Sequence, residues 1–396
     1  MLTALEEAVL IKNGRVVTPE GILECADILV EDGKIRKIGK RLTDPGEVID
    51  AEGCFVTPGF IDIHTHGGYE ADFMDATDEA WAAALAFHLD NGTTSTVATS
   101  CTAPVDSIVR FLDFTRAYMA GEHEGACRVL GAHLEGPFLS VKNKGAQKLE
   151  QLAVPARDDY SYMLDYAEVI KTVTIAPELE GADKMTRELT LRGIVVSGGH
   201  DDGIYPEFMP AVEAGLSHLT HLYCAMSDLR FKDGRRNVGL REYGLTDDRL
   251  TAEIIADNRH IPPMLARLIV RAKGADRVCV VSDSLRAAGQ PADGRVYKLG
   301  SDEDAVRFVI GDGVAVVENS ATYAGSITPV RRMVKNLIDA GIPVCAAVKM
   351  GTLTPARIVG EDKELGSLEI GKHADICILD ESFELVNLVL NGRKVR

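Results

Sequence analysis

The sequence lacks the features of a secreted, disulfide-stabilised or membrane-spanning protein. Its eight cysteines include no C-x-x-C pair, which favours reduced thiols over disulfides or a zinc ribbon. No apolar run reaches the roughly 18 residues that a membrane span requires. The first residues, MLTALEEAVLIKNG, are acidic and contain no basic segment followed by an apolar one, so they do not resemble a signal peptide. We therefore expect a cytoplasmic protein.

Positive charge is also scarce. The chain has 43 Lys and Arg against 60 Asp and Glu, a formal net charge of -17. Nucleic acids and anionic membranes are bound through Lys and Arg that displace counterions from phosphates. The composition therefore disfavours general binding of nucleic acids or anionic membranes, although it allows one local basic pocket.

The 396 residues exceed the size of a single ordinary core, so we expect a barrel-sized domain with a smaller module. Short β-rich runs with Asn-Gly and Asp-Gly turns occur at both chain ends, a pattern typical of hairpins. We predict that residues 1–56 and 355–396 together form a small β-sandwich module.

The central region, residues 57–354, alternates β-rich runs with helical stretches, such as one opened by Pro262-Pro263 and closed by Gly274. This alternation is typical of a parallel α/β fold. The candidate strands are residues 60–66, 94–100, 128–135, 172–178, 193–200, 217–222, 251–257 and 277–283. Eight β/α units in about 300 residues favour a (β/α)₈ TIM-like barrel over an open doubly wound sheet.

The segment PGFIDIHTHGG at residues 58–68 contains the first candidate metal ligands. Strand alternation places Asp62, His64 and His66 on one face. Two imidazoles on one side of a strand can bind one metal ion. Two histidines that bind nothing are an equally simple interpretation of this segment alone.

Further polar side chains recur where later strands end, which is where a barrel carries its catalytic groups. They are Glu135, His200, His221 and Asp283. Each has a structural alternative: Glu135 as a turn residue, His200 as an exposed imidazole and Asp283 as a helix N-cap. His218 competes with His221. Taken with the H-x-H pair, these imidazoles and carboxylates indicate a Zn²⁺ site, with Fe²⁺ or Mn²⁺ as alternatives.

Several motifs carry a family resemblance over nearly the whole chain. They are PGFIDIHTHG at 58–67, HLEGPF at 133–138, KGAQ at 144–147, SGGH at 197–200, THLYCAM at 220–226, SDS at 282–284 and AGS at 324–326. On these motifs the chain resembles the N-acetylglucosamine-6-phosphate deacetylase family of the amidohydrolase superfamily.

This resemblance implies a metal-dependent hydrolase. It implies these metal ligands: Glu135, His200 and His221 for one ion, with His64 and His66 available for a second. It assigns Asp283 as the general base that takes a proton from a metal-activated water. The products would be glucosamine 6-phosphate and acetate.

The resemblance also points to groups that hold the phosphorylated sugar. They are Gln147, Cys224, Ala225, Arg235, His260 and Ser326. The family's arginine that corresponds to Arg235 reaches into the neighbouring subunit's site, so a homodimer is expected.

Two positions depart from the family pattern near the expected sugar phosphate. Cys224 replaces an asparagine, and Asn258 replaces a glycine. These departures leave open a different N-acyl amino sugar, or a small N-acyl compound, as substrate. A ligand-binding relative without catalytic activity is the second alternative.

Overall fold

The computed structural model describes residues 8–43 and 46–396. Residues 1–7, which include most of the acidic start of the chain, lie outside the described residues. So do residues 44 and 45, and both gaps fall within the first segment of the predicted module.

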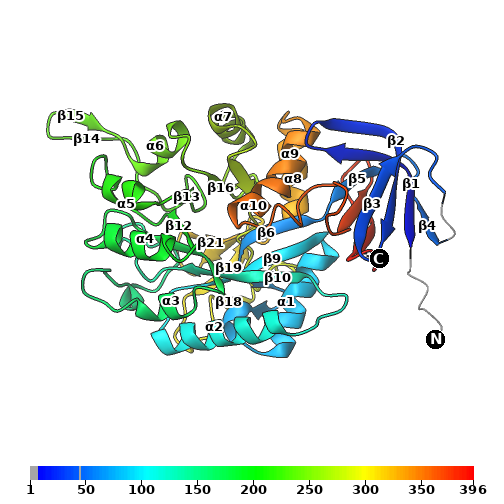
Figure 1. The fold of residues 1–396 in the computed structure, drawn as a ribbon. Helices are drawn as coiled ribbons and strands as arrows, with labels where there is room; N and C mark the ends of the chain where they lie inside the picture. Colours follow the sequence, from blue (N-terminus) through cyan, green and yellow to red (C-terminus); the bar gives the residue numbers. More distant parts are fainter. Residues whose placement is uncertain (1–7, 44–45) are drawn as a thin grey trace.

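Strands from the two chain ends form one sheet, seen at the right of Figure 1. Along the sheet the order is β24-β23-β22-β5-β1-β2-β3, with β4 paired to β1. The strands are β1 (Val9–Thr18), β2 (Gly21–Glu31), β3 (Lys34–Gly39), β4 (Glu47–Asp50), β5 (Phe55–Pro58), β22 (Ile376–Leu379), β23 (Leu385–Leu390) and β24 (Arg393–Lys394).

The antiparallel pairing of β5 with β22 joins the two ends, with Val56 opposite Ile378. Asp32 and Gly33, at φ 51° and 70°, make the turn between β2 and β3, where a two-residue hairpin loop requires positive φ. The chain ends therefore share a sheet. Its organisation as a sandwich, and the predicted domain boundaries, stay predictions.

The eight strands predicted for the central region are all present. They are β6 (Phe60–Thr65), β9 (Thr93–Ser100), β10 (Arg128–Glu135), β11 (Ile170–Ile175), β12 (Val195–Gly198), β13 (His218–Leu219), β16 (Ala252–Ile254) and β17 (Val278–Val280). The first six form a parallel sheet in the order β6-β9-β10-β11-β12-β13, and β16 pairs with β17.

Backbone hydrogen bonds connect these two sheets into a ring. The Leu222 N–H donates to Glu253 O at 2.9 Å, which links the segment after β13 to β16. The Asp283 N–H donates to His64 O at 2.9 Å, which links the end of β17 to β6. The strands thus form a TIM-like barrel. Their residues are buried along the whole strand, as in β6 and β9, because helices and loops cover the outer face of the sheet.

Helices alternate with the barrel strands (Figure 1). They are α1 (Asp78–Asp90), α2 (Val105–Ala120), α3 (Ser161–Asp165), α4 (Ala182–Thr190), α5 (Met209–Ala214), α6 (Leu240–Thr246), α7 (Pro263–Lys273), α8 (Val330–Asp339), α9 (Val344–Met350) and α10 (Leu353–Ile358). The predicted limits of α7 are confirmed: Pro262 is its N-cap and Gly274, at φ 77°, follows its last residue.

An antiparallel sheet that the sequence analysis did not identify lies between β17 and α8. Its strands are β18 (Val296–Lys298), β19 (Arg307–Gly311), β20 (Val314–Val317) and β21 (Tyr323–Gly325). The remaining elements are the pairs β7 (Gly67–Gly68) with β8 (Ala71–Asp72) and β14 (Arg230–Lys232) with β15 (Arg235–Asn237), and the 3₁₀ turns η1 (Phe73–Asp75) and η2 (Leu149–Gln151). Among the described residues, no helix has the length and apolar character that a membrane crossing demands.

Candidate active site

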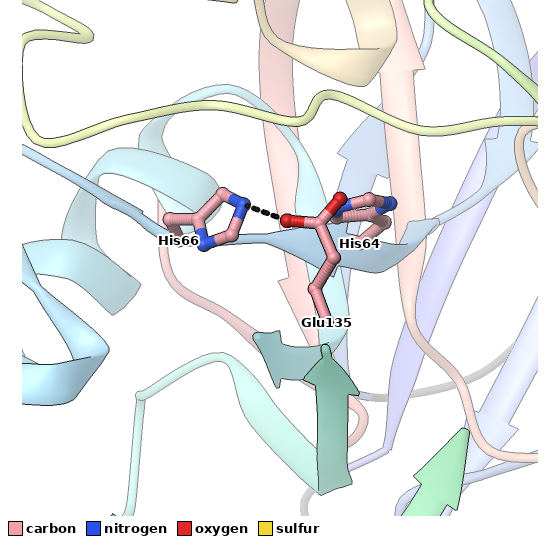
Figure 2. A group of neighbouring side chains, drawn as sticks. All are labelled: His64, His66 and Glu135. Carbon is pink, nitrogen blue, oxygen red and sulfur yellow. Dashed lines mark ion pairs between the residues drawn. The ribbon is translucent and has the colours of Figure 1, made fainter. Parts of the chain in front are cut away.

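The H-x-H pair and Glu135 meet at the C-terminal edge of the barrel. Figure 2 shows His64, on β6, and His66, just after this strand, beside the carboxylate of Glu135, at the end of β10. His66 Nε2 lies 3.5 Å from Glu135 Oε2, and His64 Nε2 lies 3.5 Å from Glu135 Oε1. All three side chains are buried.

A second group shares the same carboxylate. His200 follows β12 and His221 follows β13, and the Nε2 atom of each lies 3.1 Å from Glu135 Oε1. The two Nε2 atoms are 3.1 Å apart. Glu135 therefore belongs to two potential metal-binding groups, and in each the ligand atoms lie within 4.8 Å of one another. His218 belongs to neither of these groups, and its Nε2 lies 3.2 Å from Glu253 Oε1.

In His200 and His64, the hydrogen bond made by Nδ1 shows that Nε2, which faces the cluster, carries the lone pair. His200 Nδ1 lies 2.8 Å from the carbonyl of Asn143, so Nδ1 carries the hydrogen and Nε2 of the neutral ring presents a lone pair. His64 Nδ1 likewise donates to Glu253 Oε2 at 2.9 Å, and its Nε2 is buried with no hydrogen-bond partner. Lone pairs and carboxylate oxygens thus converge, an arrangement that fits a divalent cation.

The spacing of these atoms also fits a metal ion. Two ligands of a tetrahedral zinc ion lie about 3.3 Å apart, because each bond is about 2.0–2.1 Å long. The nitrogen–oxygen separations in the two groups are 3.1–3.5 Å. The donor set, imidazoles with a carboxylate, is one that Zn²⁺ favours.

The carboxylates on the His64 side of the cluster favour positive charge there. Burial by itself lowers the pKa of His64, but Glu253 and Glu135 outweigh burial and raise this pKa to about 9. Burial also lowers the pKa of His66, whereas its hydrogen bonds with Asp283 and Glu135 raise it to about 10. A bound cation would replace these protons and release them.

Asp283 completes the cluster just beyond β17. Its Oδ1 lies 3.3 Å from His66 Nε2 and 3.6 Å from His64 Nε2. Its backbone is fixed on both sides, since the Asp283 N–H donates to His64 O and Asp283 O accepts the Ser326 N–H at 2.8 Å. A carboxylate held here can exchange a proton with a molecule bound at the cluster.

The cluster opens into a cavity of about 650 Å³. Four of the six residues predicted to hold the sugar line this cavity: Gln147, Cys224, Ala225 and His260. Gln147 Nε2 also donates to Glu135 Oε2 at 2.6 Å, so this side chain contacts the cluster itself. His260 Nδ1 donates to Asp257 Oδ2 at 2.7 Å, which leaves Nε2 for other partners.

The other two predicted sugar-binding residues do not line the cavity of their own chain. Within the described part of the chain, the lining residues include neither Arg235 nor Ser326. Arg235 is exposed on β15, in the hairpin that projects at the upper left of Figure 1. Ser326 is buried, its hydroxyl accepts the Thr328 N–H at 2.9 Å, and its own N–H donates to Asp283 O.

Several residues of this site are not predicted from the sequence. Glu253 is one, although an acidic residue inside the apolar strand β16 is a usable signal. Other missed lining residues are Asn143, Lys144, Tyr223, Leu299 and those at 322–325. Residues 322–325 belong to or adjoin β21, and only the AGS motif at 324–326 marks part of this segment in the sequence.

Comparisons with known proteins give a consistent result. Residues 55–395 match the model of the amidohydrolase family. An N-acetylglucosamine-6-phosphate deacetylase of Bacillus subtilis (strain 168) is 32% identical, covering 98% of this chain and 97% of the relative. An N-acetylgalactosamine-6-phosphate deacetylase of Escherichia coli O157:H7 is 31% identical, covering 96% of this chain and 97% of the relative.

Solved structures agree with these sequence matches. The N-acetylglucosamine-6-phosphate deacetylase from Pasteurella multocida superposes with a TM-score of 0.89 at 29% identity, covering 98% of this chain and 99% of that one. A mutant of the Mycobacterium smegmatis deacetylase, in complex with N-acetyl-D-glucosamine-6-phosphate, gives a TM-score of 0.87 at 28% identity, with the same coverage.

Proposed function

The chain belongs to the amidohydrolase family, among its N-acetylglucosamine-6-phosphate deacetylases, and we propose that it hydrolyses the acetamide bond of N-acetylglucosamine 6-phosphate. The products are glucosamine 6-phosphate and acetate. The observation that carries this proposal is the convergence of two histidine groups on Glu135 beside Asp283, at the base of one cavity.

We assign one divalent ion to Glu135, His200 and His221, and a second to His64 and His66 with Glu135 shared. Zn²⁺ is the expected metal, with Fe²⁺ or Mn²⁺ as alternatives. When bound, such an ion makes water more acidic and polarises an amide carbonyl. The buried Nε2 of His64, which lacks a hydrogen-bond partner, supports this assignment.

Asp283 is the proposed general base and acid. Its carboxylate takes a proton from the attacking water and then returns it to the leaving amine nitrogen. The position of Oδ1 beside both rings of the H-x-H pair supports this role. No serine or cysteine nucleophile takes part in this mechanism.

The sugar phosphate is proposed to lie in the cavity above the cluster, held by the predicted residues Gln147, Cys224, Ala225, Arg235, His260 and Ser326. A dianionic phosphate suits the forked guanidinium of an arginine. We propose that Arg235 reaches the site of a second subunit in a homodimer, which its exposure on the β14–β15 hairpin supports. A charged sugar phosphate as substrate also fits the predicted cytoplasmic location.

Cys224 sets this site apart from the family pattern. Burial raises the pKa of its thiol, so the side chain stays protonated and is a weak hydrogen-bond donor. Its backbone N–H donates to His221 O at 2.8 Å. The thiol is therefore the side-chain group that Cys224 offers to a ligand, in place of an asparagine amide.

Acetate release tests the proposal most simply. The purified protein is assayed with N-acetylglucosamine 6-phosphate, its unphosphorylated form and N-acetylgalactosamine 6-phosphate, the last because one of the relatives is named for that sugar. We expect the highest kcat/KM for the phosphorylated glucosamine derivative. Equal rates with and without phosphate would contradict the proposed substrate, and no acetate from any of the sugars would contradict the proposed reaction.

A further inference from the structure

Glu253 is a fully buried carboxylate in the interior of the barrel, in the last but one position of β16. A buried charge is costly unless hydrogen bonds and opposite charges compensate it. Its oxygens have three polar partners: Oε2 lies 2.9 Å from His64 Nδ1 and 3.2 Å from His221 N, and Oε1 lies 3.2 Å from His218 Nε2.

The Oε2 contact determines how His64 faces the cluster. A carboxylate only accepts, so His64 Nδ1 must carry the hydrogen, and Nε2 of the neutral ring then presents its lone pair towards Glu135 and Asp283. Without this acceptor, the ring is free to hold its hydrogen on Nε2, where it would block a cation. A carboxylate behind a histidine ligand raises its basicity as well.

The two oxygens of Glu253 have separable partners. Oε1 contacts His218, whose Nδ1 contacts Thr251 Oγ1 at 2.7 Å on the side away from the cluster. Oε2 contacts the ring of His64, but only the backbone N–H of His221. The carboxylate therefore acts directly on the imidazole of the His64–His66–Glu135 group, and not on an imidazole of the other group.

We propose that Glu253 is a positioning residue that makes His64 a metal ligand and so allows the site to hold a second ion. This inference rests on the proposed metal site. It adds a specific dependence: the ion held by the H-x-H pair requires Glu253, whereas the ion held by Glu135, His200 and His221 does not.

The test counts bound ions rather than activity. Metal-free protein is titrated with Co²⁺, followed by its visible absorbance, and the metal content is confirmed by elemental analysis after gel filtration. We expect two ions per chain in the wild type. Glu253→Gln preserves the size of the side chain but removes its charge. We expect the affinity for the second ion to fall roughly 10- to 100-fold, the scale for the loss of a group that hydrogen-bonds to a metal ligand. The affinity for the first ion should not change.

Asp62→Asn is the matched control. Asp62 is equally buried on β6, two residues before His64, and its Oδ1 accepts the backbone N–H groups of Ser282 at 3.1 Å and of His64 at 3.4 Å. It therefore tests the loss of a buried negative charge from the same region without changing the group that accepts from His64 Nδ1. We expect it to bind two ions.

Glu253→Asp is the second variant. If the glutamine variant does not fold, this variant tests whether the second ion requires Glu253. It keeps the charge but shortens the side chain by one methylene, which moves the oxygens away from His64. The affinity for the second ion should therefore fall again, and that for the first ion should not. Two ions with wild-type affinity in the Glu253 variants would overturn the inference and leave the proposed function standing. An equal loss of both ions, or a wild type with a single ion, would also overturn it, whereas a wild type that binds no metal would overturn the proposed function itself.

Discussion

Asp283 is the residue on which the proposed chemistry depends most directly. Asp283→Asn keeps the shape of the side chain but removes its ability to take a proton. We expect kcat to fall roughly 10²-fold or more, the scale for a lost general acid or base. Metal content and thermal stability, measured on the same preparation, should stay at wild-type values. A variant with near-normal kcat would place the base on another residue.

Arg235 carries the prediction for phosphate recognition. If its guanidinium binds the phosphate, Arg235→Ala should raise KM strongly for N-acetylglucosamine 6-phosphate, because a charge-assisted contact is lost. Activity on the unphosphorylated sugar should change little, since that sugar lacks the group. The neighbouring Arg236, also exposed on β15, provides a matched control as Arg236→Ala. Equal losses on both sugars would contradict the assignment.

At the scale of elements, β21 supports the active site. Gly325 ends this strand at φ 152°, and a Cβ there would lie 2.9 Å from Asp283 O. Gly325→Ala should therefore shift the backbone of Asp283, and small misplacements of a catalytic group are costly. We expect kcat to fall roughly 10-fold or more, with the protein still folded by circular dichroism.

Gly313 provides the control for Gly325. It lies in the turn between β19 and β20 of the same sheet, at φ 78°, and a Cβ there would meet nothing within 4 Å. Gly313→Ala should cost about 1 kcal/mol of stability, because a non-glycine residue is strained at positive φ, and should leave kcat unchanged. A matching loss of kcat in both variants would show that β21 has no special effect on Asp283.

The elements that sequence could predict are those with strong local signals. The barrel strands are short β-rich runs that end at glycines or polar residues, so the strand that carries His64, for example, stands out between Pro58 and Gly67. The strands β18 to β21 are three to five residues long, no shorter than the predicted strands β13, β16 and β17, so their length does not explain why they were not identified. Their packing beside the cavity depends on contacts with distant segments, such as the Ser284–Ser326 bridge.

The residues of the candidate site also differ in whether a local sequence signal marks them. The residues that approach Glu135 could be predicted because each lies at or just after a barrel strand, where a barrel concentrates its polar groups. Glu253 stands out as an acidic residue inside an apolar strand, but its role depends on a ring 189 positions away in the chain, which no local pattern shows. The position of Arg235 relative to a cavity depends on a second subunit, which a single sequence does not describe.

At the scale of the whole molecule, the proposal requires a homodimer with shared sites. A chain with Asp283→Asn and a chain with Arg235→Ala should each have low activity on the phosphorylated sugar. When the two are co-expressed, the mixed dimer contains one site with an intact Asp283 and an arginine from the other chain. Acetate release by the purified mixed dimer should therefore approach half that of the wild type. No gain over the separate variants would mean that Arg235 does not act across the subunits.

Metal dependence tests the central claim most directly. Chelator-treated protein, freed of metal and checked by elemental analysis, is assayed for acetate release from N-acetylglucosamine 6-phosphate before and after addition of Zn²⁺, Fe²⁺ or Mn²⁺. Because the imidazoles and carboxylates of the site converge on Glu135 as a potential metal site, we predict that the metal-free protein is inactive and that a divalent ion restores turnover. Full activity in the metal-free protein would contradict the account.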